Sequence, residues 1–175
     1  MNFKKLFTLS IALFGVVISF TSCGKDDGAI PNNVSIIDIP AITTNKDASA
    51  SANITLASPG SFAGRFTALL YFAGAPQPER VDIVVRKTNG TTINNNNVKV
   101  FSANITALPV TLNVTVAQIE ALFGAPIALR DNYDFAPDIY VKGVKYEAFP
   151  LVGAGTGAGV RAMPLFNEFA RYTVQ

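Results

Sequence analysis

Hydrophobic and polar residues alternate with a period of two over much of the chain after residue 34. In the longest such stretch, residues 62–72, Phe62, Phe66 and Leu70 fall on one face, whereas Arg65 and Thr67 fall on the other. A period of two is typical of a β-strand with one buried face. Similar but shorter runs predict further strands at 34–39, ending near 53–56, at 81–86, from 98 onward, at 110–114, 133–141, 144–149 and 166–174.

Charged residues occupy alternate positions in two of these predicted strands. Asp82 and Arg86 interrupt one apolar run, and Asp134 and Asp138 interrupt another. Because alternate side chains point to opposite faces of a sheet, we expect all four to lie on a solvated face. Asp131, Asp134 and Asp138 could instead supply oxygen ligands to Ca²⁺, although their spacing is not that of an EF-hand.

One helix is predicted directly after the run at 110–114. Thr115 can cap its N-terminus, and Gln118 can reach back to complete a capping box. Ile119 and Leu122 would form its apolar face, and Gly124 would end it after two turns. The list of strands with this helix predicts an all-β sandwich.

The N-terminus follows a different pattern. Lys4 and Lys5 precede an uncharged apolar run at 6–20, which is followed by small polar residues and Cys23. About 20 apolar residues are needed to span a bilayer, so residues 1–22 are predicted to be a secretory signal peptide rather than a membrane helix. We expect residues 23–33 to form a polar tether and residues 34–175 to form the folded domain.

The sequence around the cysteine resembles the lipobox of bacterial lipoproteins. Phe20-Thr21-Ser22-Cys23 is similar to the boxes of Bacteroidetes lipoproteins, which often end in Ser-Cys, and Lys25-Asp26-Asp27 resembles their surface-sorting signal. This resemblance implies that Cys23 is acylated and that the protein is anchored in the outer membrane, facing the cell exterior. Two or three acyl chains bind a membrane firmly without any spanning helix. The alternative is that Cys23 is a free thiol beside a conventional cleavage site.

A second resemblance concerns the folded domain. Pro109-Val110-Thr111-Leu112, Leu122-Phe123-Gly124 and residues 138–143 (Asp-Ile-Tyr-Val-Lys-Gly) resemble immunoglobulin-like surface lipoproteins of Bacteroidetes, including the amino-terminal domains of SusE-like proteins. The resemblance implies a single immunoglobulin-like β-sandwich of seven or eight antiparallel strands with one short helix. It also implies an accessory role in nutrient (glycan) capture beside an outer-membrane transporter.

Composition narrows the possible chemistry. Removal of residues 1–22 takes away Lys4 and Lys5, so that the 14 basic residues fall to 12 and balance the 12 acidic ones, which argues against a nucleic-acid partner. The chain has no His and a single Cys, which excludes His-based catalysis and an intramolecular disulfide. The Gly-rich stretch at 153–158 fits a nucleotide-binding pattern in form only, because no βαβ unit surrounds it. We therefore predict no enzymatic activity, no metal and no cofactor.

Loop tips and tyrosines are the candidate binding residues. Asn95, Asn96 and Arg161 lie in predicted loops, where rigid sandwiches commonly carry recognition. Tyr140 and Tyr146 could stack on sugar rings, or they could pack across the sheet, which we favour. The function predicted is non-enzymatic binding in glycan capture. The alternative is a structural adhesin or fimbria-like subunit whose edge strands pair with neighbouring subunits.

Overall fold

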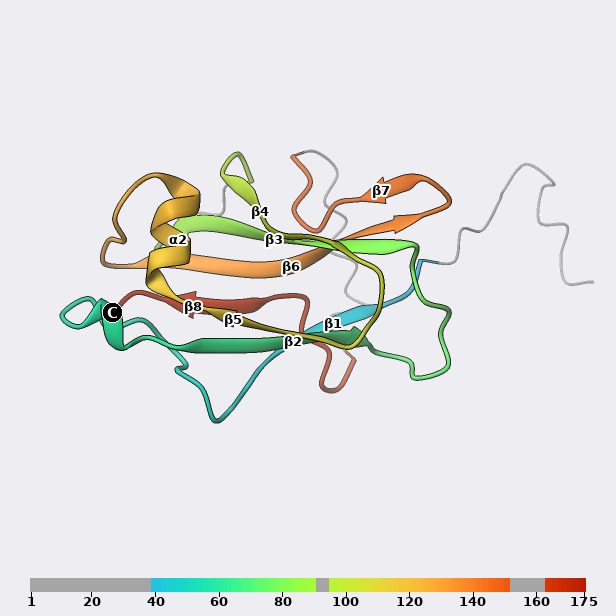
Figure 1. Ribbon diagram of the computed structural model, residues 1–175, viewed down its shortest axis with the longest axis horizontal. Helices are drawn as coiled ribbons and strands as arrows, with labels where there is room; N and C mark the ends of the chain where they lie inside the picture. Colours follow the sequence, from blue (N-terminus) through green and yellow to red (C-terminus); the bar gives the residue numbers. More distant parts are fainter. Residues whose placement is uncertain (1–38, 91–94, 152–162) are drawn as a thin grey trace, which may run out of the picture. The chain divides into compact units, whose positions relative to one another are not determined.

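Two antiparallel β-sheets make up most of the computed structural model, which describes residues 39–90, 95–151 and 163–175 (Figure 1). The smaller sheet has the order β1-β2-β5 and consists of β1 (Ile42–Lys46), β2 (Gly64–Leu70) and β5 (Val110–Val114). The larger sheet has the order β4-β3-β6-β7, with β8 also paired to β6, and consists of β4 (Val98–Ile105), β3 (Arg80–Asn89), β6 (Asp131–Val141), β7 (Val144–Tyr146) and β8 (Ala170–Thr173). A single-turn 3-10 helix, η1 (Pro59–Ser61), precedes β2.

The prediction of an all-β sandwich of seven or eight strands with one short helix is confirmed, and the described residues form eight strands. β1, β2 and β5 form one layer of the sandwich, and β4, β3, β6, β7 and β8 form the other. The immunoglobulin-like class of this sandwich stays a prediction.

The main core lies between the two sheets. Phe66 of β2 and Phe135 of β6 are fully buried, with their ring centroids 5.3 Å apart. Tyr172 of β8 is also buried, and its hydroxyl donates a hydrogen bond of 2.9 Å to the backbone oxygen of Arg65. This bond satisfies the phenol inside an apolar core, where an unpaired hydroxyl would be costly.

The predicted helix is confirmed as α2 (Val116–Phe123). The Thr115 hydroxyl accepts a hydrogen bond from the backbone N–H of Gln118, and the Gln118 side chain accepts one from the backbone N–H of Thr115, at 3.3 and 2.9 Å. Gly124 adopts the left-handed conformation (φ 65°) that ends many helices. No helix of the described residues is long and apolar enough to cross a membrane.

The strands near the start of the described chain differ from those predicted from the sequence. The prediction of a strand ending near 53–56 is wrong, because Ile54 makes only an isolated bridge to Val174. The sequence analysis missed β1, whose residues Thr43 and Thr44 are polar yet buried. Polar residues at these positions hide the strand from a pattern search. Thr43 can be buried because its hydroxyl accepts a hydrogen bond from the backbone N–H of Asn167, 2.9 Å away. The predicted strand at 34–39 falls almost entirely outside the described residues.

The prediction that Asp82, Arg86, Asp134 and Asp138 lie on a solvated face is wrong, because all four are buried. They do share the face of the larger sheet that points away from the main core. That face, however, is covered by the chain that follows β7 and the chain that precedes β8, and it carries its own small apolar cluster of Val84, Ala136 and Phe149. Alternation therefore assigned these side chains to the correct face but not to the correct environment.

Candidate functional site

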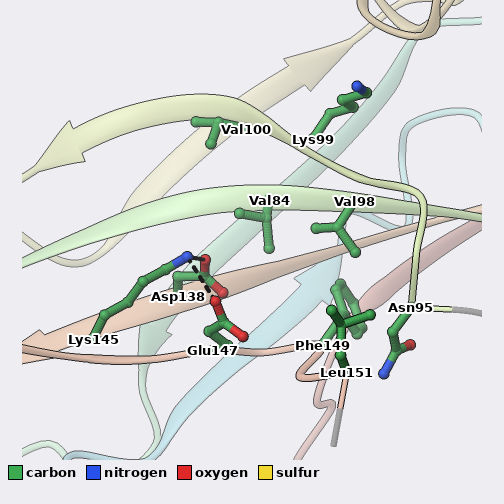
Figure 2. Close-up of a pocket in the computed structure, with 10 residues that line it drawn as sticks. All are labelled: Val84, Asn95, Val98, Lys99, Val100, Asp138, Lys145, Glu147, Phe149 and Leu151. Atoms are coloured by element: carbon green, nitrogen blue, oxygen red, sulfur yellow. Dashed lines mark hydrogen bonds and ion pairs between the residues drawn. The ribbon is translucent and has the colours of Figure 1, made fainter.

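A pocket of about 240 Å³ opens on this outer face of the larger sheet (Figure 2). Val84 of β3 and Asp138 of β6 come from its central strands. Its other lining residues come from the turn before β4, from the start of β4 and from the chain that includes and follows β7, and they are Asn95, Val98, Lys99, Val100, Lys145, Glu147, Phe149 and Leu151. The pocket thus combines apolar side chains with both signs of charge.

Lys145 organises the charged end of the pocket. Its Nζ lies 2.9 Å from Asp138 Oδ2 and 3.2 Å from Glu147 Oε1 (Figure 2). The hydrogen bond with Asp138 is the main reason why the pKa of Lys145 is raised to about 12, so its ammonium is charged at neutral pH. The other oxygen of Asp138 accepts the backbone N–H of Ala148 at 2.8 Å, which fixes the chain after β7 against the sheet.

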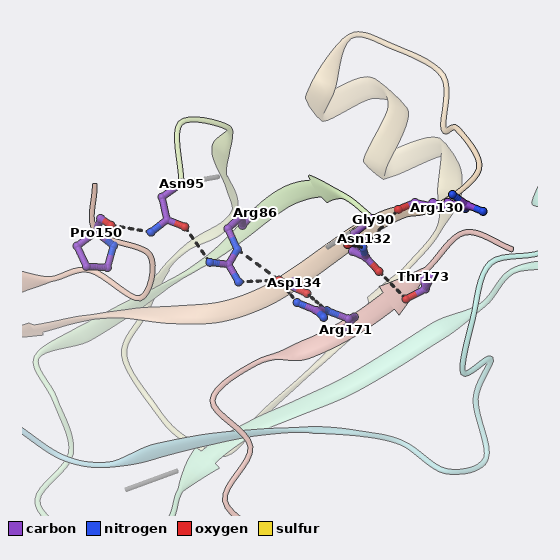
Figure 3. Close-up of polar contacts among 9 residues, drawn as sticks. All are labelled: Arg86, Gly90, Asn95, Arg130, Asn132, Asp134, Pro150, Arg171 and Thr173. Carbon is purple, nitrogen blue, oxygen red and sulfur yellow. Dashed lines mark hydrogen bonds and ion pairs between the residues drawn. The ribbon is translucent and has the colours of Figure 1, made fainter. Parts of the chain in front are cut away.

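Beside the pocket, Asp134 holds two arginines (Figure 3). Its carboxylate accepts hydrogen bonds from Arg86 Nη2 at 2.8 Å and from Arg171 Nε at 2.6 Å. Arg86 lies opposite Asp134 in the β3–β6 ladder, and Arg171 lies opposite it in the β6–β8 ladder. The Asp134 side chain has no exposed surface, so this carboxylate depends entirely on the two guanidinium groups.

Aromatic rings cover the two arginines. The Arg86 guanidinium lies 4.1 Å from the centroid of Phe149, and that of Arg171 lies 5.0 Å from the centroid of Phe169. A cation over an aromatic face gains electrostatic attraction, and more so where water is excluded. These contacts hold the chain around Phe149 and Phe169 against the sheet, and Phe149 also lines the pocket.

Asn95 links Arg86 to the chain that follows β7, at Pro150. Its Oδ1 accepts a hydrogen bond from Arg86 Nη1 at 2.8 Å, and its Nδ2 donates one to the backbone oxygen of Pro150 at 2.6 Å (Figure 3). The candidate binding residue Asn95 therefore lines the pocket and also positions its wall. Asn96, the next residue, is exposed.

The two candidate tyrosines do not line this pocket. Tyr140 donates its hydroxyl hydrogen to Asp82 Oδ2 at 3.0 Å, and its ring lies 3.5 Å under the Arg80 guanidinium. This arrangement fits the packing interpretation for Tyr140. Tyr146 pairs with Ile139 across the β6–β7 ladder, so it faces the opposite side of the sheet from Lys145. Arg161 and the residues of the lipid anchor, Cys23, Lys25, Asp26 and Asp27, lie outside the described residues.

Each aspartate of β6 is paired with a cation. Asp131 lies 2.8 Å from Lys87 Nζ, Asp134 binds the two arginines, and Asp138 binds Lys145. In the part of the chain that the structure describes, no three His, Cys, Asp or Glu residues come together as a metal site. These carboxylates therefore serve ion pairs within the fold.

Sequence reasoning missed Lys145, Glu147 and Phe149 as site residues, and it missed the ion pairs beneath them. The sequence signal that could have indicated an ion pair was the opposite charge of Arg86 and Asp134, each of which interrupts a predicted apolar strand. It could be used only if the β3–β6 register were known, because the two residues are 48 positions apart.

No protein-family model, curated protein or solved structure matches this chain.

Replacement of Asp134 by Ala should lower the free energy of unfolding by about 3 kcal/mol, because removal of one partner leaves the Arg86 charge buried without compensation. Urea denaturation followed by circular dichroism measures this change. Arg171→Gln is the matched control and should cost less, since 42% of the Arg171 side chain is exposed. Equal losses for the two variants would contradict this account.

Acid should weaken a second ion pair. Burial raises the pKa of Asp131, but hydrogen bonds from Lys87, Asn89 and the Ala128 N–H outweigh burial and leave the pKa below its usual value. Its contribution to stability is therefore complete above the unfolded-state pKa of about 4 and is lost as the pH falls through the lower folded-state pKa. The free energies of unfolding of the wild type and Asp131→Asn should differ at pH 7 and converge below about pH 4 in urea titrations. A difference that does not change with pH would refute this assignment.

Proposed function

We propose that this protein is a lipid-anchored, non-enzymatic glycan-binding protein of the outer membrane. In this proposal acylated Cys23 holds it on the cell surface, and the pocket around Lys145 takes one sugar unit of a polysaccharide. The anchor rests on the lipobox and on the sorting residues Lys25, Asp26 and Asp27. The resemblance to SusE-like proteins favours a position beside an outer-membrane transporter.

The observation that carries the binding role is the pairing of a donor and an acceptor at the pocket wall. The Lys145 ammonium and the Glu147 carboxylate lie 3.2 Å apart, and nearly half of the Glu147 side chain is exposed. Two neighbouring hydroxyls of a sugar ring can use such a pair, one accepting from the ammonium and the other donating to the carboxylate. The apolar side chains of Val98, Phe149 and Leu151 suit the carbon face of the same ring.

Two features favour binding over catalysis. Glycoside hydrolysis needs one carboxyl group that gives up a proton and a second that acts as a base or nucleophile. Both carboxylates that line the pocket, Asp138 and Glu147, are instead committed to ion pairs with Lys145. The chain also lacks histidine, the residue most often used for proton transfer.

The structural alternative, an adhesin or fimbria-like subunit, draws some support from the sheet edges. A groove lined by uncharged residues, among them Phe101, Leu112 and Leu122, lies between the edge strands β4 and β5 and helix α2. However, β4 carries register shifts opposite Val81 to Val84, and irregular edge strands discourage pairing with another chain. We therefore prefer the glycan-binding proposal.

Glu147→Gln should weaken glycan binding about tenfold, because the neutral amide replaces a charged acceptor for a sugar hydroxyl. Affinity electrophoresis in gels that contain soluble polysaccharides measures retardation of the protein. Glu120→Gln on α2 is the matched control and should leave retardation unchanged. If no polysaccharide retards the wild type, or if both variants behave alike, the pocket is not the binding site.

Cys23→Ala should release the protein from the membrane fraction, because the acyl chains would have no sulfur to attach to. Fractionation with immunoblotting measures the release, and mass spectrometry of the wild type measures the acyl mass on Cys23. A variant that stays in the membrane fraction would contradict the anchor.

A further inference from the structure

One end of the sandwich carries a cluster of exposed apolar side chains. Tyr71, just after β2, stacks against Phe72 and Phe166 with centroid distances of 4.9 and 5.5 Å. The Tyr71 hydroxyl donates a hydrogen bond to the backbone oxygen of Pro164 at 2.8 Å, and its backbone N–H donates one to Ala41. Three segments that are distant in sequence therefore meet where the described chain enters β1 (Figure 1).

We call this surface the apolar tip and define it by Ile39, Tyr71, Phe72, Leu165 and Phe166. Ile39 is 41% exposed and Phe72 is 54% exposed. The three contributing segments, residues 39–45, 71–78 and 163–167, contain no charged residue. Charged residues near these segments include Glu168, two residues after Phe166, and Glu79, Arg80 and Lys142 at the adjoining ends of β3 and β6.

Leu165 is the least expected residue of the tip. It is 89% exposed, and its φ of 63° places it in the left-handed region. It follows Pro164 in a tight turn closed by a 3.2 Å hydrogen bond from Phe166 N to Met163 O, a position where glycine or asparagine is usual. A leucine there strains the backbone and gains little packing in return, and such outliers commonly mark functional positions.

We propose that the apolar tip docks onto the lipid surface to which Cys23 anchors the protein. This inference rests on the proposed anchor. Residues 24–38 join Cys23 to Ile39, and a linker of this length spans at most about 55 Å even when fully extended, so the end that carries Ile39 stays within that distance of the bilayer. Tyrosine, phenylalanine and leucine are residues that favour the membrane interface, and an uncharged surface can enter it without desolvating ions.

The orientation can be tested with a fluorophore at two exposed leucines. Leu165→Cys places the only unacylated thiol at the tip, whereas Leu129→Cys places it just before β6, at the opposite end of the sandwich. Leu129 is also exposed, at 56%, so neither label should disturb the fold. Each acylated, full-length mature protein is labelled with an environment-sensitive dye and reconstituted into phosphatidylcholine vesicles that contain nitroxide-labelled acyl chains.

We expect the dye at position 165 to lose fluorescence by quenching and the dye at position 129 to keep it. If neither dye is quenched while mass spectrometry shows acylated Cys23, the docking inference fails and the anchor stands. Quenching at position 129 alone, or equally at both positions, also overturns it. If Cys23 carries no acyl group, the proposed anchor itself fails.

Leu165→Gly tests whether the leucine serves the fold instead. Glycine relieves the left-handed backbone, so the thermal midpoint should rise by about 2 to 4 °C. A rise supports a role for Leu165 outside the fold, and a fall in the midpoint would show that the leucine packs against the protein and would overturn its assignment to a membrane contact.

Discussion

The ion pairs of Asp134 with Arg86 and Arg171 require a covering layer on the larger sheet, because the Asp134 carboxylate is buried on the face that no second sheet covers. A carboxylate without exposed surface is stable only when its partners are held in place and further hydrogen bonds satisfy them. Asn95, Phe149 and Phe169 provide these contacts. The irregular chain around them is thus a required third layer, and the sheet is packed on both faces.

The pocket exists because this third layer is incomplete. Phe149 closes the region over Arg86, whereas Lys145 and Glu147 lie at its border and are partly exposed. The pocket wall is consequently set by buried contacts, while the groups that can meet a ligand remain accessible. A site with a rigid base and exposed polar groups is suited to recognition, since little order has to be gained on binding.

The sequence predicted the elements better than their surroundings. Alternation at 62–72 located β2, and the capping box at Thr115 located α2, because both signals are local. The burial of Arg86 and Asp134 depends on the strand register and on covering loops, neither of which has a local signal. The same limit explains why Lys145 and Glu147 were passed over: their ion pairs form only once β7 folds back on β6.

Several of the bonds that close the sandwich join very distant parts of the chain. The hydroxyl of Tyr172 bonds to Arg65 across 107 positions, and Thr43 bonds to Asn167 across 124. Because closing long loops costs entropy before any contact repays it, a topology of this kind folds in milliseconds to seconds rather than microseconds. During that interval apolar strands such as β2 remain uncovered, and a holding chaperone that shields them would suppress aggregation before the sheets meet.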